Sequence, residues 1–365
     1  MMNQVLMIIM AAGAVLGGAD RICGNRLGLG EQFEKGFHLL GSMALSMVGM
    51  ICLAPVLADG LGKLIVPLYR AIGVDPAMFG SFLAIDMGGY QMAKELAADP
   101  QMGSYAGLIV AATFGCTLVF TIPVGMGMIH ASDRNLFARG IMLGLAAMPL
   151  GLVAGGLMCG LPLGVCLWQN IPIFFLSLLL FIGLRRIPHL MVKGFCAAAQ
   201  GLRCVLTAGL ILAAVESLTG WNPLAGMAPI EEALGVVASI GVVMLGSLPI
   251  AELLRRALAR PMRRIGARLG LNAQSVTGML IGTVSALPAL AAYDQMDRRG
   301  KVAVGAFFVS GTGVLASHLG FVVSTEPDML GALITAKLVG ALAAAALAVW
   351  ILRRDVDAPD EGPTA

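Results

Sequence analysis

The sequence predicts an all-α polytopic membrane protein. Hydrophobic residues make up 58% of the 365 residues, charged residues make up only 12%, and the mean hydropathy is +0.88. A soluble domain carries roughly a quarter charged residues. At about 20 residues per crossing, the chain has room for about nine to eleven transmembrane segments with short loops.

The apolar segments follow one another along nearly the whole chain. Residues 1–16 lack a basic start and a small-residue cleavage site, so they predict a retained first helix rather than a signal peptide. We expect a single integral membrane domain over 1–352 and a polar cytoplasmic tail at 353–365. The predicted segments are near 2–19, 37–58, 75–92, 103–130, 138–166, 168–184, 192–216, 230–253, 272–293, 301–325 and 328–352.

Two stretches of the chain resemble each other. Pro55 and Pro67 are matched by Pro249 and Pro261, each 194 residues later. Gly73 is matched by Gly270, 197 residues later, and further matches of small residues follow. We therefore expect one repeat at about 37–130 and a second at about 230–325. Such repeats are common in secondary transporters, which bind their substrate between the repeats.

Loop charges predict how the repeats are oriented. The arginine-rich loop at 255–268 and the basic loop at 184–193 belong on the cytoplasmic side, and the acidic connector at 216–232 belongs outside. Most of the remaining basic loops also fall inside if 75–92 and 272–293 enter the membrane and return, although Lys63 and Arg70 then fall outside. We therefore expect nine crossings and two re-entrant or broken helices in inverted repeats. Eleven plain crossings with parallel repeats is the alternative.

One carboxylate lies inside an apolar run. Asp86 is followed at once by Gly88, Gly89 and Tyr90. An ionisable residue at membrane depth indicates a functional site, and paired glycines favour a broken backbone whose polar groups can face a ligand. A carboxylate beside an aromatic ring suits a small cationic amine. The structural alternative is an ion pair of Asp86 with Lys94 or Arg70.

Polar residues also interrupt the second repeat. Thr283 and Ser285 lie in the second predicted break, and Ser310 and His318 lie in the segment that follows. His318 is a candidate to hydrogen-bond a substrate hydroxyl or to pass protons, and a packing histidine is the alternative. The hydroxyls of Thr113, Thr117 and Thr121 are expected to bond back to helix carbonyls.

Enzyme and cofactor motifs are weak or missing. The seven cysteines form no CxxC pair, so we expect no metal and no cofactor. The glycine-rich stretch at 24–30 lacks the context of a nucleotide site, and we expect no nucleic-acid partner. A membrane-embedded enzyme acting on a lipid amine or alcohol is the rival class, although no second catalytic group converges on Asp86. A scaffold in the lipid bilayer is a third, and the glycine spacings leave a homo-oligomer open.

These residues resemble a known family, the bacterial ethanolamine permeases of the ethanolamine-utilisation operon, EutH. The strings that carry the resemblance span the chain and are Asp20-Arg21, Gly24-Asn25-Arg26, Gly28-Leu29-Gly30, Phe33-Glu34-Lys35-Gly36-Phe37, Ala44-Leu45-Ser46-Met47-Val48-Gly49, Asp75-Pro76-Ala77-Met78-Phe79, Asp86-Met87-Gly88-Gly89-Tyr90, Met296-Asp297-Arg298-Arg299-Gly300-Lys301-Val302 and His318-Leu319-Gly320-Phe321.

The resemblance implies a multi-pass permease of the bacterial cytoplasmic membrane that carries ethanolamine by alternating access and is not an enzyme. Asp86 would bind the ammonium, with Tyr90 as an aromatic wall, and His318, Ser310 or Thr283 would bind the hydroxyl. Ile85, Gln91 and Ser317 stand where the family pattern has Asn, Pro and Asp. These departures favour a different or bulkier amine, or weaker binding.

Overall fold

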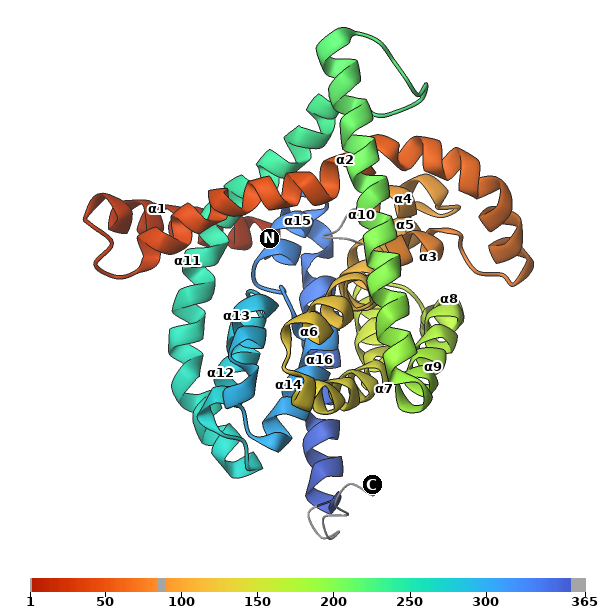
Figure 1. The fold of residues 1–365 in the computed structure, drawn as a ribbon. Helices are drawn as coiled ribbons and strands as arrows, with labels where there is room; N and C mark the ends of the chain where they lie inside the picture. The colour runs from red at the N-terminus through yellow and green to blue at the C-terminus, as the bar shows by residue number, and fades with distance from the viewer. Residues whose placement is uncertain (1, 84–88, 356–365) are drawn as a thin grey trace.

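The computed structural model describes residues 2–83 and 89–355, and every element within them is helical (Figure 1). The elements labelled η are 3-10 or π-helices. In chain order the elements are α1 (Met2–Ile22), α2 (Leu29–Ala71), α3 (Ala77–Gly80), η1 (Ser81–Leu83), α4 (Gly89–Leu96), α5 (Pro100–Ser104), η2 (Tyr105–Gly115), η3 (Thr117–Thr121), α6 (Ile122–Met128), η4 (Ala131–Asp133), α7 (Arg134–Met158), α8 (Leu163–Gln169), α9 (Ile171–Arg186), α10 (Pro188–Thr219), α11 (Ile230–Leu269), α12 (Ala273–Gly282), α13 (Ala286–Ala291), η5 (Tyr293–Gln295), α14 (Arg298–Gly311), α15 (Ser317–Thr325), η6 (Pro327–Met329) and α16 (Leu330–Asp355).

Six of the described helical stretches are long and apolar enough to cross a membrane. A seventh is added if α8 and α9, which meet at an angle of 51° beside Asn170, form one bent span. The six stretches contain α2, α5 to α6, α7, α10, α11 and α16. The helical class is therefore confirmed, with fewer long spans than the nine crossings that the sequence predicts.

With α8 and α9 counted as the span predicted at 168–184, two further predicted crossings account for the difference. The segment at 2–19 forms α1, which lies against α2 and α11 and is not one of the six. The segment at 301–325 is interrupted, because α14 ends at Gly311 and α15 begins only at Ser317. Gly313, between them, has a φ of 68°, a left-handed conformation that glycine adopts without steric cost. The sequence analysis placed breaks at 75–92 and 272–293 and missed this one.

The two longest helices share several features. α2 has 43 residues and α11 has 40, and each contains two prolines. Proline removes a helix hydrogen bond and bends the chain, and Figure 1 shows α2 as a long arc across the molecule. A glycine in the left-handed conformation follows each helix, Gly73 with a φ of 68° and Gly270 with a φ of 74°.

Small residues bring the central helices together. α7, α14 and α16 each pack against the other two. A Cβ atom added at Gly140 would collide with the backbone of α14, and one added at Gly151 would collide with the backbone of α16. These contacts confirm that glycine spacings such as that of Gly151 and Gly155 serve close helix packing.

Candidate functional site

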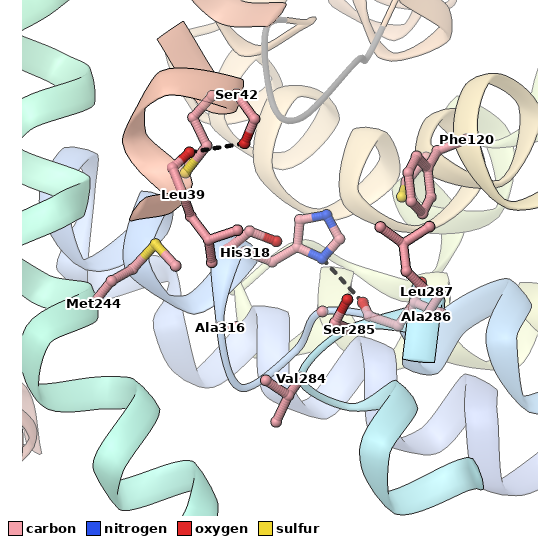
Figure 2. Close-up of a pocket in the computed structure, with 15 residues that line it drawn as sticks. Leu39, Ser42, Phe120, Met244, Val284, Ser285, Ala286, Leu287, Ala316 and His318 are labelled. Carbon is pink, nitrogen blue, oxygen red and sulfur yellow. Dashed lines mark hydrogen bonds between the residues drawn. The ribbon is translucent and has the colours of Figure 1, made fainter. Parts of the chain in front are cut away.

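A pocket of about 260 Å³ lies between helices from both halves of the chain (Figure 2). Its walls come from α2, from Cys116 and Phe120 in the π-helical region, from Met244 of α11, and from the breaks that separate α12 from α13 and α14 from α15. The lining is mostly apolar, with a few polar groups at the two breaks. This composition is typical of sites that bind small molecules.

The two breaks are held against each other by their backbones. The amide of Gly313 donates to the carbonyl of Gly282 at 3.1 Å, and the amide of Leu315 donates to the carbonyl of Thr283 at 2.8 Å. Ser285 has extended backbone angles and immediately precedes α13 as its N-cap. Non-helical backbone at membrane depth persists only where protein or a water-filled cavity satisfies it. The bonds between the breaks supply part of that satisfaction, and the pocket lies beside them.

His318 is the only titratable ring among the residues that line this pocket. Its Nδ1 lies 3.1 Å from the carbonyl oxygen of Thr312, and the side chain is 4% exposed. A carbonyl has no proton to give, so Nδ1 carries the hydrogen, and in the neutral ring Nε2 is left as an acceptor. Figure 2 shows the ring between Leu39 on one side and Phe120 and Leu287 on the other.

Of the other residues predicted for the site in the second repeat, only one lines the pocket. Ser285 lines the pocket together with His318. Thr283 does not line the pocket, and its hydroxyl donates to the carbonyl of Leu280 at 2.6 Å. Ser310 does not line the pocket. Its hydroxyl is buried without a hydrogen-bond partner and lies near Gly340 of α16. The structure therefore brings Ser285 and His318 together and leaves Ser310 outside.

The first repeat contributes a separate group of residues. Asp86 and Gly88 lie outside the described residues. Gly89 begins α4, and Tyr90 does not line the pocket. The Tyr90 hydroxyl donates to Glu326 at 2.7 Å. Lys94, one turn later on α4, forms an ion pair with the same carboxylate at 2.8 Å.

Lys337 is a residue that the sequence analysis missed. It lies within α16, its side chain is fully buried, and its ammonium donates to the carbonyl of Ala112 at 2.6 Å. Ala112 belongs to the π-helix η2, a wide helical form that often occurs at functional sites. Lys337 is the only charged residue between Asp328 and Arg353. The rule that singled out Asp86, an ionisable group inside an apolar span, applies to it equally.

Two of the three threonine hydroxyls in the π-helical region have the predicted partners. Thr113 donates to carbonyls of its own turn, and Thr117 donates both to Thr113 and to the carbonyl of Val309 on α14. Thr121 has no hydrogen-bond partner. In the part of the chain that the structure describes, no group of three or more His, Cys, Asp or Glu side chains is placed to hold a metal ion.

Comparison with known proteins gives one family. Residues 2–351 match the family described as "Ethanolamine utilisation protein, EutH". The chain is 38% identical to the "Probable ethanolamine permease EutH" of Listeria monocytogenes, covering 96% of this chain and 95% of the relative. It is 38% identical, with the same coverage, to the "Uncharacterized protein YxeR" of Bacillus subtilis. It is 36% identical to the "Probable ethanolamine permease EutH" of Salmonella typhimurium, covering 97% and 96% of the two chains. No solved structure matches.

Proposed function

This chain belongs to the EutH family of ethanolamine utilisation proteins, and we propose that it is a permease for ethanolamine or a closely related small cationic amino alcohol. The long apolar helices and the family place it in the bacterial cytoplasmic membrane. Its role is to transport the amine rather than to transform it.

The observation that carries this proposal is the pocket at the two helix breaks. Its volume of about 260 Å³ is below the roughly 300–1,000 Å³ of sites for drug-sized ligands, which suits a molecule with two carbons. Broken helices near the middle of a membrane protein are where secondary transporters bind their substrates.

The chemistry of the pocket suits the hydroxyl end of the substrate. An amino alcohol can donate its hydroxyl hydrogen to Nε2 of His318, because Nδ1 is already committed to the carbonyl of Thr312. Ser285 lies on the same lining and offers both a donor and an acceptor. We assign the hydroxyl-binding role to these two residues before Thr283 and Ser310.

The ammonium needs a carboxylate, and Asp86 remains our candidate for that role on the strength of its sequence context. Gly88 and Gly89 would allow the backbone to approach the substrate, and Tyr90 would supply an aromatic face.

We further propose that the two halves of the chain are inverted repeats that alternate the access of the pocket. Matching hydrogen bonds support this. The amide of Val74 donates to Tyr69 after α2, and the amide of Leu271 donates to Gly266 after α11, an offset of 197 residues at both donor and acceptor. Aspartates also cap α5 and α14: Asp99 accepts from the amide of Gln101, and Asp297 accepts from the amide of Gly300. A 3-10 turn and a long helix follow each repeat, η4 with α7 and η6 with α16.

In this arrangement 75–92 and 272–293 would be re-entrant or broken segments of opposite orientation. The interruptions after α12 and after α14 are consistent with discontinuous helices at the site. Rocking of one repeat against the other would expose the pocket to each side of the membrane in turn.

Uptake of radiolabelled ethanolamine into proteoliposomes tests the proposed function. At about pH 6 the amine is almost wholly protonated, so little leaks through the bilayer as the neutral form. We expect saturable uptake by the wild type, strong loss in Asp86→Asn, and reduced uptake in His318→Ala. The matched control is His130→Ala, an exposed histidine between α6 and η4, which should transport normally. Folded wild-type protein without saturable uptake would refute the proposal.

A further inference from the structure

The ammonium of Lys94 is surrounded by three groups that recognise ammonium ions. Its Nζ lies 2.8 Å from Oε1 of Glu326 and 3.3 Å from the hydroxyl of Ser104, and 5.8 Å from the centre of the Tyr90 ring. A carboxylate, a hydroxyl and an aromatic face together provide charge pairing, hydrogen bonding and cation–π attraction. These groups come from three separate elements, α4, α5 and the connection between α15 and η6.

We propose that Tyr90, Ser104 and Glu326 form a binding site for a primary ammonium group, and that Lys94 occupies this site with its own ammonium until substrate replaces it. We call these three residues the Glu326 site. The inference rests on the proposed function for its choice of substrate, and its geometry stands independently.

The Glu326 site keeps its shape through contacts that do not involve Lys94. The Tyr90 hydroxyl donates to the Glu326 carboxylate at 2.7 Å, and the Tyr90 ring packs edge-on against Phe321 at 5.4 Å between centroids. Burial raises the pKa of Glu326, but with Lys94 in place the contacts with Lys94, Ser104 and Tyr90 outweigh burial and hold the pKa below the usual value. The carboxylate is therefore ionised and positioned at neutral pH.

The site favours a primary ammonium over a substituted one. A lysine ammonium has three N–H donors, and the site offers two oxygen acceptors and a ring face. The head group of ethanolamine, a CH2–NH3+ unit, is the same as the end of the lysine side chain. A quaternary ammonium lacks the N–H donors that Glu326 and Ser104 accept.

A free amine can replace the ammonium of Lys94 in the Glu326 site. The Lys94 side chain is 34% exposed and that of Glu326 is 24% exposed, so a soluble amine can reach the carboxylate. A short flexible tether gives its end group an effective concentration on the order of millimolar. Lys94 therefore competes with free amine and lowers the affinity of the wild-type Glu326 site. The substrate can then move readily from this site to the pocket at the helix breaks.

The location connects the Glu326 site with the pocket. His318 lies in the first turn of α15, and Glu326 follows the last residue of the same helix. At 1.5 Å per residue they are about 12 Å apart along the helix. Gln91 and Glu95, on another face of α4, line a second cavity of about 310 Å³ with Glu232. Its acidic groups would raise the local concentration of cations beside the Glu326 site.

Chemical rescue of a variant without Lys94 tests this inference. The melting temperature of purified Lys94→Ala is measured during titration with ethanolammonium chloride, with sodium and tetramethylammonium chlorides as references at equal ionic strength. We expect ethanolammonium to raise the melting temperature of Lys94→Ala in a saturable manner and more than it does for the wild type. This additional rise should vanish in Lys94→Ala/Glu326→Gln. Lys94→Met, which keeps the aliphatic stem, serves if Lys94→Ala does not fold.

The matched control is Lys63→Ala, which removes a lysine from the exposed ion pair with Asp59 and should respond as the wild type does. Equal shifts in Lys94→Ala and in the double variant, or equal shifts with tetramethylammonium, would overturn the inference. Wild-type uptake without rescue would refute the Glu326 site alone. Rescue without wild-type uptake would refute the permease and leave the site standing.

Discussion

Two lysine–carboxylate pairs in this chain each have a tyrosine beside them and differ in what the tyrosine hydroxyl contacts. In the Glu326 site the hydroxyl of Tyr90 donates to the carboxylate that Lys94 also contacts. In a second group, Asp133, Tyr293 and Lys301, the hydroxyl of Tyr293 donates instead to the backbone carbonyl of Lys301 at 2.6 Å. We call this second group the Asp133 cluster.

The two pairs also differ in enclosure. Lys301 and Asp133 lie 2.7 Å apart and their side chains are only 12% and 13% exposed, against 34% and 24% for Lys94 and Glu326. The carboxylate of Glu326 has a second donor that remains if its lysine leaves. The Asp133 cluster is closed, and its tyrosine fixes the backbone of the lysine. The comparison indicates a fixed structural ion pair in the Asp133 cluster and an exchangeable ion pair in the Glu326 site.

The largest expected effect on stability comes from breaking the ion pair of the Asp133 cluster. Lys301→Ala leaves an enclosed carboxylate without its cation, and we expect a loss of about 3 kcal/mol in the free energy of unfolding. Lys94→Ala should lose only about 1 kcal/mol, because the Glu326 carboxylate keeps Tyr90 and contact with solvent. Unfolding in a detergent titration measures both. Equal losses would remove the distinction between the two pairs.

The tyrosine hydroxyls sharpen the comparison. Tyr90→Phe and Tyr293→Phe each remove one hydrogen bond, at an expected cost of about 1 kcal/mol. In the Lys94→Ala background, Tyr90→Phe should weaken ethanolammonium binding, because it releases the carboxylate, and Tyr293→Phe should leave binding unchanged. Titration of the melting temperature with ethanolammonium gives the readout. Weakening by Tyr293→Phe to the same degree would show that the tyrosines act only on global stability.

Lowering the pH is expected to change stability less than the lysine and tyrosine substitutions do. The folded pKa of Glu326 is below its ordinary value of 4.5. Its contribution to stability is therefore fully present above pH 4.5 and is lost as the pH falls through the lower, folded value. The stability difference between the wild type and Glu326→Gln should stay constant from neutral pH down to about pH 5 and shrink below that. A difference that shrinks already between pH 7 and pH 5 would contradict the lowered pKa.

Local patterns in the sequence predict much of the fold. The break at 272–293 follows from Thr283, Ser285 and Pro288 in an apolar run, and the structure ends α12 at Gly282 and begins α13 at Ala286. The break after Gly311 was missed although Gly313 was visible, because glycine is also common inside transmembrane helices. Its left-handed conformation is held by the bond from its amide to Gly282, a partner 31 residues away.

The candidate site is harder to predict because its contacts are distant in sequence. Tyr90 and Glu326 are separated by 236 residues, and nothing local to α4 indicates that its tyrosine and lysine share one carboxylate. A single sequence does not show such pairings. Lys337 is different, since a charge in an apolar span is a local signal, and the same argument that selected Asp86 would have selected it.

The central claim is that ethanolamine binds in the pocket at the helix breaks, and a native cysteine tests it directly. Cys116 lines the pocket, whereas Cys23 is exposed after the end of α1. The rates at which N-ethylmaleimide modifies each cysteine of the wild-type protein are followed by peptide mass spectrometry, with ethanolamine or ethylene glycol present. We predict that ethanolamine slows modification of Cys116 at concentrations that saturate uptake and does not affect Cys23. An unchanged rate at Cys116 under saturating uptake would place the substrate elsewhere and contradict the account.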